Sequence, residues 1–275
     1  MEQKRRPHRG RRKKVSAMSN VVLVIALAVF LFSAYKLISI YSEYHKGDKE
    51  YDNIAEDAVE VVTPEEDKAD ETEAGKAVTV HSSLKIDFDK LQKINKDVVG
   101  WIQFDEPKKI SYPVVKGADN DKYLTTTYEG KKNSSGAIFM DAANAGDFSD
   151  KNTFIYGHNM KNGSMFGQLR KFKTKDYYEQ NPFFYIYTLD GKEVKYQIFA
   201  VCIVEDTSRS YTRFYNNDEE YLDYLKYIKN IARYDTGVEV TAESKIISLS
   251  TCTNVSETQR ILVHGVKISE TVVGE

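Results

Sequence analysis

Cys252 is the residue in this sequence whose type and position most favour chemistry. It follows a strand-like run, Lys-Ile-Ile-Ser-Leu-Ser-Thr at 245–251, and precedes a polar stretch at 253–257. The end of a strand presents a thiol at the edge of a cleft, and a thiolate there is a strong nucleophile. The alternative is a small apolar core residue, which is what most free cysteines are. The residues around Cys252 leave both interpretations open.

Cys202, the other cysteine, lies inside the apolar run Phe-Ala-Val-Cys-Ile-Val at 199–204, which favours core packing. Two cysteines exclude a disulfide scaffold and a zinc site with four cysteine ligands. A disulfide between Cys202 and Cys252 would be permitted outside the cell, and it would remove any nucleophile.

A thiol nucleophile needs a group that takes its proton or stabilises the thiolate, and histidine is the usual supplier. His8, His45 and His81 lie in a basic tail, beside an apolar run and at the start of the folded part, so His158 and His264 are the candidates. His158 follows an apolar strand and a glycine, on a polar loop. His264 shares a face of the last expected strand with residue 260, so it is either a competitor or a hydrogen-bonded structural residue.

Arg260 begins the last expected strand, eight residues after Cys252, so a loop and a turn can return its guanidinium to the thiol. A fixed guanidinium donates hydrogen bonds to the oxyanion that forms when a carbonyl carbon is attacked. The alternative is an ordinary arginine at a strand edge. Together, Cys252, Arg260 and one histidine would supply a nucleophile, a charge stabiliser and a proton carrier.

Short apolar runs separated by turn residues predict the strands that must position these side chains. They are expected at 99–104, 112–115, 136–140, 152–156, 183–189, 193–205, 245–251 and 261–269. An Asp-Gly pair at 190–191 predicts a tight hairpin. Helical spacing predicts helices at 87–96, 166–171 and 218–234, the first with Asp87 as its N-cap. This order indicates one mostly antiparallel barrel or sandwich with helical decoration, and periodicity does not choose between the two.

The N-terminal 41 residues predict a membrane anchor. Residues 1–19 form a basic tail, and residues 20–41 are apolar enough and long enough to cross a bilayer if Lys36 reaches outward. The positive-inside rule then keeps 1–19 in the cytoplasm and places the rest outside. The competing interpretation, a cleaved signal peptide, is disfavoured because the run is long and no clear small-residue cleavage site follows it.

Residues 42–79 are expected to form an acidic extracellular linker, with thirteen Asp and Glu against three Lys at 43–75. Such a segment buries too little apolar surface to offset its ordering entropy, and its self-repulsion keeps it extended. A partial helix near 53–62 is compatible with the pattern. Residues 80–275 then form the folded domain.

The composition is that of a globular protein, with 41% hydrophobic and 29% charged residues among 275 and a formal net charge of −2. The basic tail and the acidic linker nearly cancel, so the folded part is close to neutral. Nothing in its charge favours binding to nucleic acid.

At Ser-Leu-Ser-Thr-Cys, residues 248–252, the sequence resembles the Thr-Leu-x-Thr-Cys signature of sortases. Arg260 at the start of the next strand and the string Tyr-Gly-His-Asn at 156–159 belong to the same resemblance, which extends from about residue 84 to 268. The opening helix, the long inserted helix and the string at 156–160 resemble class B. Ser248 replaces the first threonine of the signature, a conservative departure.

The resemblance implies an eight-stranded sortase-type β-barrel with an N-terminal helix and a helix inserted between strands 6 and 7, preceded by a single transmembrane helix. It implies a cysteine transpeptidase in which Cys252, His158 and Arg260 are catalytic. Ser250 and Thr251 are candidates for binding the substrate. The chemistry implied requires no metal and no organic cofactor.

The resemblance also implies the partners and the location. The substrates would be secreted proteins with a C-terminal sorting signal of the Asn-Pro-x-Thr-Asn or Pro-x-Thr-Gly type, cut after threonine. The acceptor would be an amine of a peptidoglycan cross-bridge, and the enzyme would be a single-pass protein of a Gram-positive cell membrane. The alternatives are a secreted papain-like thiol hydrolase, a non-enzymatic surface adhesin or assembly scaffold, and a pilin-polymerising sortase with a lysine acceptor.

Overall fold

The computed structural model describes residues 17–62, 81–253 and 255–273 of the chain. These residues fall into two compact units that divide between Glu43 and Tyr44. Helix α1 (Ala17–Ala58) contributes to both units.

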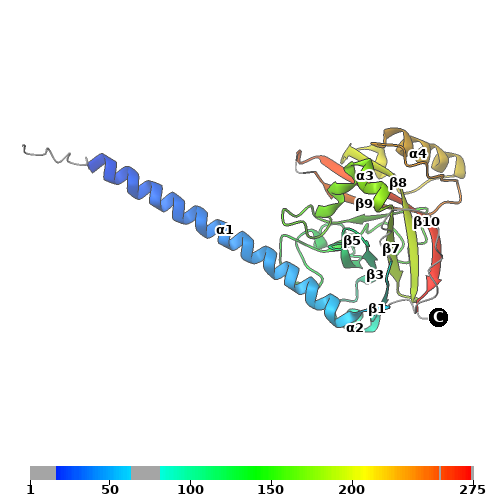
Figure 1. Cartoon of the computed structure of the whole chain (residues 1–275), viewed down its shortest axis with the longest axis horizontal. Helices are drawn as coiled ribbons and strands as arrows, with labels where there is room; N and C mark the ends of the chain where they lie inside the picture. Colours follow the sequence, from blue (N-terminus) through cyan, green and yellow to red (C-terminus); the bar gives the residue numbers. More distant parts are fainter. Residues whose placement is uncertain (1–16, 63–80, 254, 274–275) are drawn as a thin grey trace, which may run out of the picture. The chain divides into compact units, whose positions relative to one another are not determined.

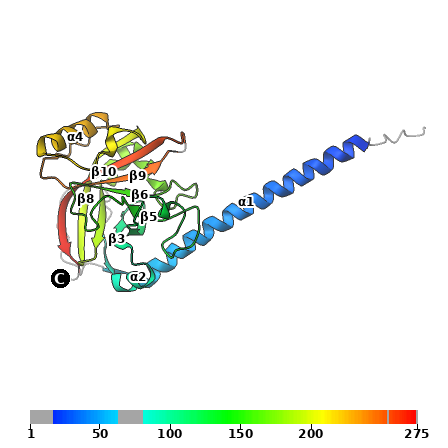
Figure 2. The ribbon, with the colours of Figure 1, turned by 180° about the vertical axis from the view of Figure 1, so that it is seen from behind.

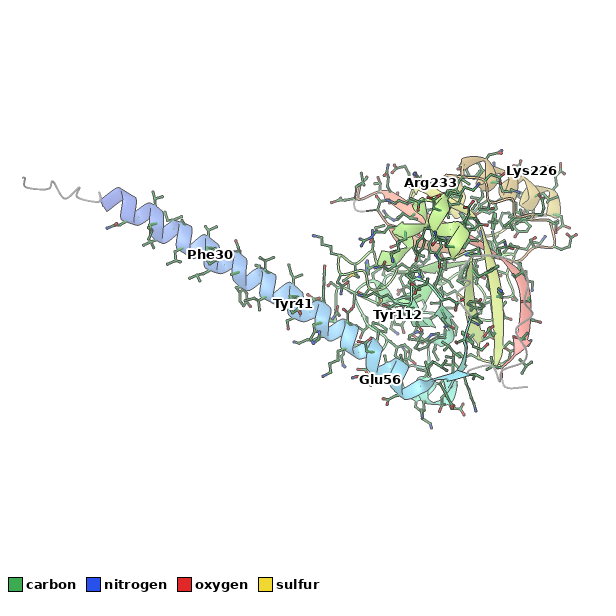
Figure 3. All side chains as sticks on the ribbon, viewed as in Figure 1. Phe30, Tyr41, Glu56, Tyr112, Lys226 and Arg233 are labelled. Carbon is green, nitrogen blue, oxygen red and sulfur yellow. The ribbon has the colours of Figure 1, made fainter. Side chains whose placement is uncertain are left out.

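The first unit consists of the N-terminal part of α1. Within the described ranges, α1 is the one helix that is apolar and long enough to cross a membrane, by its length and composition, and its most apolar window has a mean hydropathy of 2.6. Its apolar side chains are exposed, among them Phe30 and Tyr41, which are labelled in Figure 3. Residues 1–16 of the expected basic tail at 1–19 lie outside the described residues.

The second part of α1 differs from the extended acidic linker that the sequence predicted. From Tyr44 onward it belongs to the second unit, and Tyr51, Ile54 and Ala58 are buried there. Their spacing of three and four residues gives the helix one apolar stripe, which the excess of acidic residues around it obscured. Two short strands that the sequence did not predict, β1 (Val59–Val62) and β2 (Ser83–Ile86), then pair antiparallel. Residues 63–80 of the expected linker lie outside the described residues.

Eight strands of the described chain form a closed barrel, in the order β10-β8-β7-β3-β4-β5-β6-β9 (Figure 1). The pairs β4–β5 and β6–β9 are parallel, and the other pairs are antiparallel. This confirms the predicted eight-stranded barrel and resolves the choice between barrel and sandwich. The strands are β3 (Val98–Gln103), β4 (Ser111–Val115), β5 (Ile138–Met140), β6 (Asn152–Tyr156), β7 (Phe183–Thr188), β8 (Lys192–Glu205), β9 (Ile246–Cys252) and β10 (Gln259–Val272).

The predicted hairpin joins β7 to β8, as the Asp-Gly pair indicated. Gly191 has a φ of +78°, a conformation that residues with a Cβ rarely adopt, and its N–H donates to Thr188 O at 3.0 Å. The two strands it joins are antiparallel neighbours in the barrel.

Helix α2 (Phe88–Ile94) opens the domain, and Asp87 caps it by accepting from the Lys90 N–H. Helix α4 (Asp218–Ile231) is inserted between β8 and β9, the sixth and seventh strands of the barrel, as predicted. The short helix predicted near 166–171 is a 3-10 helix, η2 (Gly167–Lys173), and helix α3 (Lys175–Gln180) after it was not predicted. Two further 3-10 turns are η1 (Lys122–Leu124) and η3 (Arg209–Tyr211).

Apolar side chains form two clusters, one on each side of the strands β8, β9 and β10. The larger one fills the barrel and includes Leu249 and Val263. The smaller one lies between the outer face of these strands and α4, where Leu225 and Ile228 are buried, and Figure 2 shows α4 beside the strands that it covers. Strand residues therefore alternate between the barrel interior and an outer face.

Candidate active site

His158, Cys252 and Arg260 lie at or just after the ends of three neighbouring strands. Strand β9 lies between β6 and β10 in the barrel. Arg260 of β10 is the direct antiparallel partner of Cys252. In the parallel pair β6–β9, Tyr156 lies opposite Ser250, and two further residues along each chain lead to His158 and Cys252. The His158 loop therefore lies next to the end of β9 on one side, and Arg260 lies next to Cys252 on the other.

Cys252 lies on the outer face of the barrel. Leu249 of β9 belongs to the interior cluster, whereas Ile246 packs with α4, and Cys252 is an even number of residues from Ile246. Its thiol is free and its side chain is half-buried. Because directly opposite residues of an antiparallel pair have Cβ atoms about 5 Å apart, Arg260 projects from the same face next to the thiol.

His158 follows β6 through a glycine that the local packing requires. A Cβ on Gly157 would lie 2.4 Å from Ile138 Cδ1 and 2.8 Å from Phe166 Cδ2. The His158 imidazole is half-buried, and its Nε2 lies 2.7 Å from the carbonyl oxygen of Leu124. A carbonyl only accepts hydrogen bonds, so Nε2 carries a proton, and Nδ1 is the nitrogen that can exchange one with a reacting group.

Asn159, the next residue, links the His158 loop to the strand that carries the thiol. Its Nδ2 donates to the Cys252 carbonyl oxygen at 2.8 Å. Its Oδ1 is buried without a hydrogen-bond partner among the described residues. The amide therefore ties the end of β6 to the end of β9 and leaves one acceptor unused.

The Arg260 guanidinium is fixed by contacts on two sides. Its Nη1 donates to the carbonyl oxygens of Glu257 at 2.5 Å and Gln259 at 3.1 Å. Its Nη2 donates to Asp206 Oδ2 at 3.1 Å, at the end of β8. These contacts use only part of the five-donor fork of an arginine, so the guanidinium keeps N–H groups that can bind a further acceptor.

The residues just before the cysteine have two different environments. Ser250, on the same face as Cys252, contacts the Tyr211 hydroxyl at 2.8 Å between the two oxygens. Tyr211 stacks on Phe154 of β6, and burial raises its pKa to about 12. Thr251 is on the opposite face, and its buried Oγ1 has no hydrogen-bond partner within the described part of the chain.

The competing residues are buried elsewhere. His264 is fully buried under α4, where its Nδ1 lies 2.8 Å from Ser248 Oγ, and burial lowers its pKa to about 3. Cys202 packs in the same cluster, and burial raises its pKa to about 12. The prediction of core packing for Cys202 is thus confirmed, and His264 is too enclosed to exchange protons with a substrate at Cys252.

His81, at the other side of the domain, is held by two carboxylates. Its Nδ1 lies 2.7 Å from Asp105 Oδ1, its Nε2 lies 3.2 Å from Glu193 Oε1, and its ring stacks on Tyr185. Burial opposes protonation of His81, but the hydrogen bonds to the two carboxylates outweigh it and raise its pKa to about 9. His81 therefore secures β2 to the barrel.

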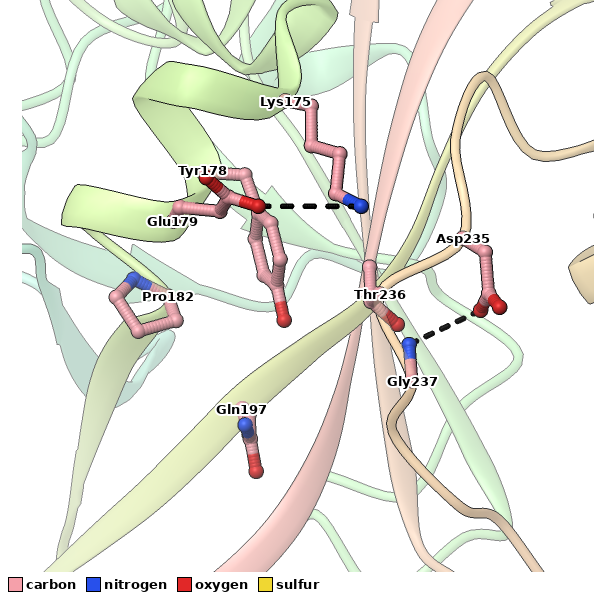
Figure 4. Close-up of a pocket in the computed structure, with 8 residues that line it drawn as sticks. All are labelled: Lys175, Tyr178, Glu179, Pro182, Gln197, Asp235, Thr236 and Gly237. Atoms are coloured by element: carbon pink, nitrogen blue, oxygen red, sulfur yellow. Dashed lines mark hydrogen bonds and ion pairs between the residues drawn. The ribbon is translucent and has the colours of Figure 1, made fainter.

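Within residues 17–62, 81–253 and 255–273, no group of three or more His, Cys, Asp or Glu side chains is arranged to hold a metal ion. A polar hollow of about 580 Å³ between α3 and the loop at 235–237 is separate from the strand ends (Figure 4). Gln197, which lines it, pairs with Val266, six residues along β10 from Arg260, which is about 20 Å of strand.

Four residues that contact the strand ends were not singled out from the sequence. These are Leu124, Asn159, Asp206 and Tyr211. Asn159 stands next to His158 in the string at 156–159, so a local signal for it existed. The carbonyl of Leu124 has no such signal, because any residue type supplies one.

The comparisons with known proteins agree with this architecture. The sortase domain family matches residues 105–268. A sortase B of Listeria monocytogenes is 34% identical over 241 residues, covering 86% of this chain and 90% of that protein. A crystal structure of sortase B from Bacillus anthracis has a TM-score of 0.67 and 30% identity, covering 84% of this chain and all of that one. For sortase B of Clostridium perfringens the TM-score is 0.63 and the identity 32%, over 66% of this chain and all of that one.

The closed barrel and these matches assign the chain to a class of enzymes, the cysteine transpeptidases that anchor surface proteins. The chain belongs to the sortase family, in its class B. Members of this family act on sorting-signal substrates and cell-wall amines.

Proposed function

We propose that this sortase cleaves a C-terminal sorting signal of the Asn-Pro-x-Thr-Asn or Pro-x-Thr-Gly type after its threonine and joins the protein to a peptidoglycan amine. The observation that supports the proposal is that Arg260 pairs directly with Cys252 and that the parallel pairing of β6 with β9 ends two residues before His158 and Cys252. A nucleophile, a proton carrier and a guanidinium on one face of neighbouring strands are what acyl transfer requires.

In the first half-reaction, the Cys252 thiolate attacks the carbonyl carbon of the threonine. The carbonyl oxygen becomes an oxyanion, and an N–H of Arg260 stabilises it. The intermediate collapses, the C–N bond breaks, and the His158 imidazolium gives the proton of its Nδ1 to the departing amine. The product is a thioester on Cys252 and a neutral imidazole.

In the second half-reaction, the neutral His158 takes a proton from the acceptor amine as its nitrogen attacks the thioester. The C–S bond then breaks, the Cys252 thiolate is released, and an amide joins the threonine to the cross-bridge. Imidazolium and thiolate are restored together, so the enzyme neither gains nor loses a proton over the whole cycle.

Of the two residues expected to bind the substrate, Ser250 is the one we propose, because it shares the outer face with Cys252, whereas the side chain of Thr251 is buried on the opposite face. The Ser250 hydroxyl is shared with Tyr211, which places the 3-10 turn η3 over the face that carries Cys252. This turn would form one wall of the peptide site, and a peptide there would lie across the outer face of β9.

We also propose that α1 anchors the enzyme through residues 20–41, with residues 1–19 in the cytoplasm and the barrel outside the cell. The support is the apolar helix in the described chain and the basic residues that precede it. Residues 80–275 remain the proposed catalytic domain, together with the part of α1 that packs on it. A single-pass anchor would keep the barrel where secreted substrates and the wall meet.

The test of this function is acceptor dependence. The full-length protein in detergent micelles is incubated with a sorting peptide, with and without an amine such as triglycine. We expect a ligated product in which threonine is joined to the amine, and only slow hydrolysis without it. Equal rates with and without amine, and no ligated product, would favour a thiol hydrolase and contradict the proposal.

The remaining alternatives are distinguished by active-site variants and by a second type of acceptor. If the protein were a non-enzymatic adhesin or scaffold, the Cys252→Ala and His158→Ala variants would leave every phenotype intact. If it polymerised pilins, a lysine side chain would replace the cross-bridge amine as the better acceptor. Each outcome would overturn a different part of the proposal.

A further inference from the structure

The second part of α1 contacts two chain segments that lie next to His158 in the fold. One is the segment 123–137, which contains Leu124, and the other is the loop 159–165, which follows His158. On the first segment, Glu129 N donates to Glu50 Oε1 at 3.1 Å. On the second, Asn162 Nδ2 donates to Asp48 Oδ2 at 2.8 Å. A helix outside the barrel therefore contacts both the segment that holds the His158 imidazole and the loop that follows it.

Tyr51 makes the closest link from α1 to the first segment. Its side chain is buried, its hydroxyl donates to the Gly136 carbonyl oxygen at 2.7 Å, and it accepts from the Tyr128 N–H at 3.2 Å. One hydroxyl thus uses its donor and one acceptor position on the backbone at two points of the segment. Losing it would leave a buried carbonyl and a buried N–H unpaired, which is costly.

Gly136 transmits that contact to Leu124. A Cβ on Gly136 would lie 2.3 Å from the Tyr123 carbonyl oxygen and 2.8 Å from the Leu124 carbonyl oxygen, so the two backbones are in direct contact. Gly136 has a φ of +56°, which favours glycine. The Leu124 carbonyl that accepts from His158 Nε2 is therefore in contact with Gly136, the residue whose carbonyl oxygen accepts from Tyr51.

Tyr112 makes a second link, from α1 to the loop after His158. Its ring packs edge-on against Tyr51, with 5.3 Å between the ring centroids, and its hydroxyl accepts from the Met165 N–H at 3.0 Å. The loop is closed by the Phe166 N–H, which donates to the His158 carbonyl oxygen at 3.0 Å. Figure 3 labels Tyr112 inside the barrel domain.

We propose that Tyr51 is a positioning residue for His158: through Gly136 it fixes the Leu124 carbonyl, and through Tyr112 it supports the loop 159–165. The proposal rests on the proposed catalytic role of His158. The second part of α1 would then contribute to the active site, because it determines which His158 nitrogen is protonated and how the imidazole is oriented. A positioning error of about 1 Å is enough to slow a reaction by orders of magnitude.

The test compares Tyr51→Phe with a matched control, Tyr221→Phe, in the full-length protein. Tyr221 is equally buried, and its hydroxyl lies 3.0 Å from the Lys151 carbonyl oxygen and 2.8 Å from that of Ser244, at the opposite end of β6 from His158. We expect Tyr51→Phe to lower kcat by about 10-fold with an unchanged KM for the peptide. Both variants lose a buried hydroxyl and should therefore lower the Tm by similar amounts, but Tyr221→Phe should leave kcat unchanged.

A spectroscopic readout separates positioning from general destabilisation. With ¹⁵N-labelled histidine, the His158 signals are assigned by their loss in His158→Ala. In the wild type they should report a proton on Nε2, and in Tyr51→Phe they should move toward a mixture of tautomers, while Tyr221→Phe should retain the wild-type pattern. If Tyr51→Phe does not fold, Tyr112→Phe tests the second link with the same expected fall in kcat.

Two failures are distinguishable. If His158→Ala retains transpeptidation, His158 is not the proton carrier, and both its proposed catalytic role and this inference are wrong. If His158→Ala is inactive but Tyr51→Phe has the kcat and the His158 signals of the wild type, the function stands and the positioning role of Tyr51 is overturned.

Discussion

Two regions of this barrel each contain a cysteine and a histidine, and only one of them is suited to catalysis. Cys252 and His158 lie at strand ends on the outer face, where the side chains are half-buried. Cys202 and His264 lie in the middle of β8 and β10 under α4, where both are fully buried. The same two residue types therefore occur twice, and burial decides the chemistry that each pair can do.

Burial decides what each pair can do. In the α4 cluster, desolvation raises the pKa of the Cys202 thiol to about 12 and lowers the pKa of His264 to about 3, so both groups are neutral at neutral pH. A neutral thiol and a neutral imidazole without access to solvent cannot form the thiolate and imidazolium that acyl transfer uses. Cys252 differs in being only half-buried and in having the guanidinium-bearing Arg260 as its direct strand partner.

The largest difference between the two regions should appear when each thiol is removed. We expect Cys252→Ala to lower transpeptidation by about 10⁴-fold or more, because the nucleophile is lost. Cys202→Ala should keep the activity of each folded molecule and lower the free energy of unfolding by about 1 to 2 kcal/mol, because it leaves a small cavity. Peptide ligation rates and urea unfolding measure the two effects, and equal activities of the two variants would refute the distinction.

Loss of the guanidinium beside Cys252 should have the next largest effect. Arg260→Gln is expected to lower kcat by about 10² to 10³-fold, because an oxyanion donor is lost. Lys267→Gln is the matched control, since Lys267 is a cation on the same strand, seven residues from Arg260, whose ion pair with Glu270 at 2.7 Å is partly exposed, and it should leave kcat unchanged. A steady-state comparison of both variants checks this, and an Arg260→Gln enzyme with full kcat would remove Arg260 from the mechanism.

Thiol labelling should separate the two cysteines without any mutation. We expect a thiol reagent to modify Cys252 in the folded protein at pH 7 and to leave Cys202 unmodified, because Cys202 is buried and its pKa is raised to about 12. Denaturation should make both cysteines react. Peptide mapping after labelling measures this, and rapid labelling of Cys202 in the native protein would contradict its buried position.

The buried His264 and the half-buried His81 should make stability depend on pH in opposite directions. His264 has a folded pKa of about 3, below its unfolded value, so the unfolded chain takes up a proton that the folded chain does not as the pH falls from about 6.5. Stability should then fall by up to about 1.4 kcal/mol per pH unit between pH 6 and pH 4. His81 has a raised pKa of about 9, so its contribution is complete below pH 6.5 and is lost as the pH rises toward 9.

Urea unfolding of the full-length protein at several pH values measures these slopes. The wild type and His264→Asn should differ in slope between pH 4 and pH 6, and the wild type and His81→Gln between pH 6.5 and pH 9. Parallel slopes in either comparison would show that the histidine concerned does not couple protonation to folding.

The sequence predicted most barrel strands because each is a short apolar run bounded by turn residues. The residues of β6 were predicted at 152–156, where the structure has them, and the hairpin at Gly191 followed from one dipeptide. Closure of the sheet was not readable in this way, because the parallel pairing of β6 with β9 joins segments about 90 residues apart. The resemblance to sortases supplied what periodicity did not.

The candidate site was predictable only in part. Cys252 stood out by its place at a strand end, but the strand pattern left His158 and His264 open, because it does not reveal burial, and only the resemblance to sortases favoured His158. The contribution of α1 was missed because its acidic residues outnumber Tyr51, Ile54 and Ala58, although their spacing forms a stripe. Backbone partners such as the Leu124 carbonyl have no signature in sequence.

The most direct test of the central claim is the site of the acyl adduct. The full-length protein is incubated with a sorting peptide without an acceptor amine, and the protein is then analysed by intact mass and peptide mapping. The account predicts an adduct ending in threonine on Cys252, which disappears when an amine is added and the ligated peptide forms. An adduct on Cys202, or none in a protein that nevertheless cleaves the peptide, would contradict it.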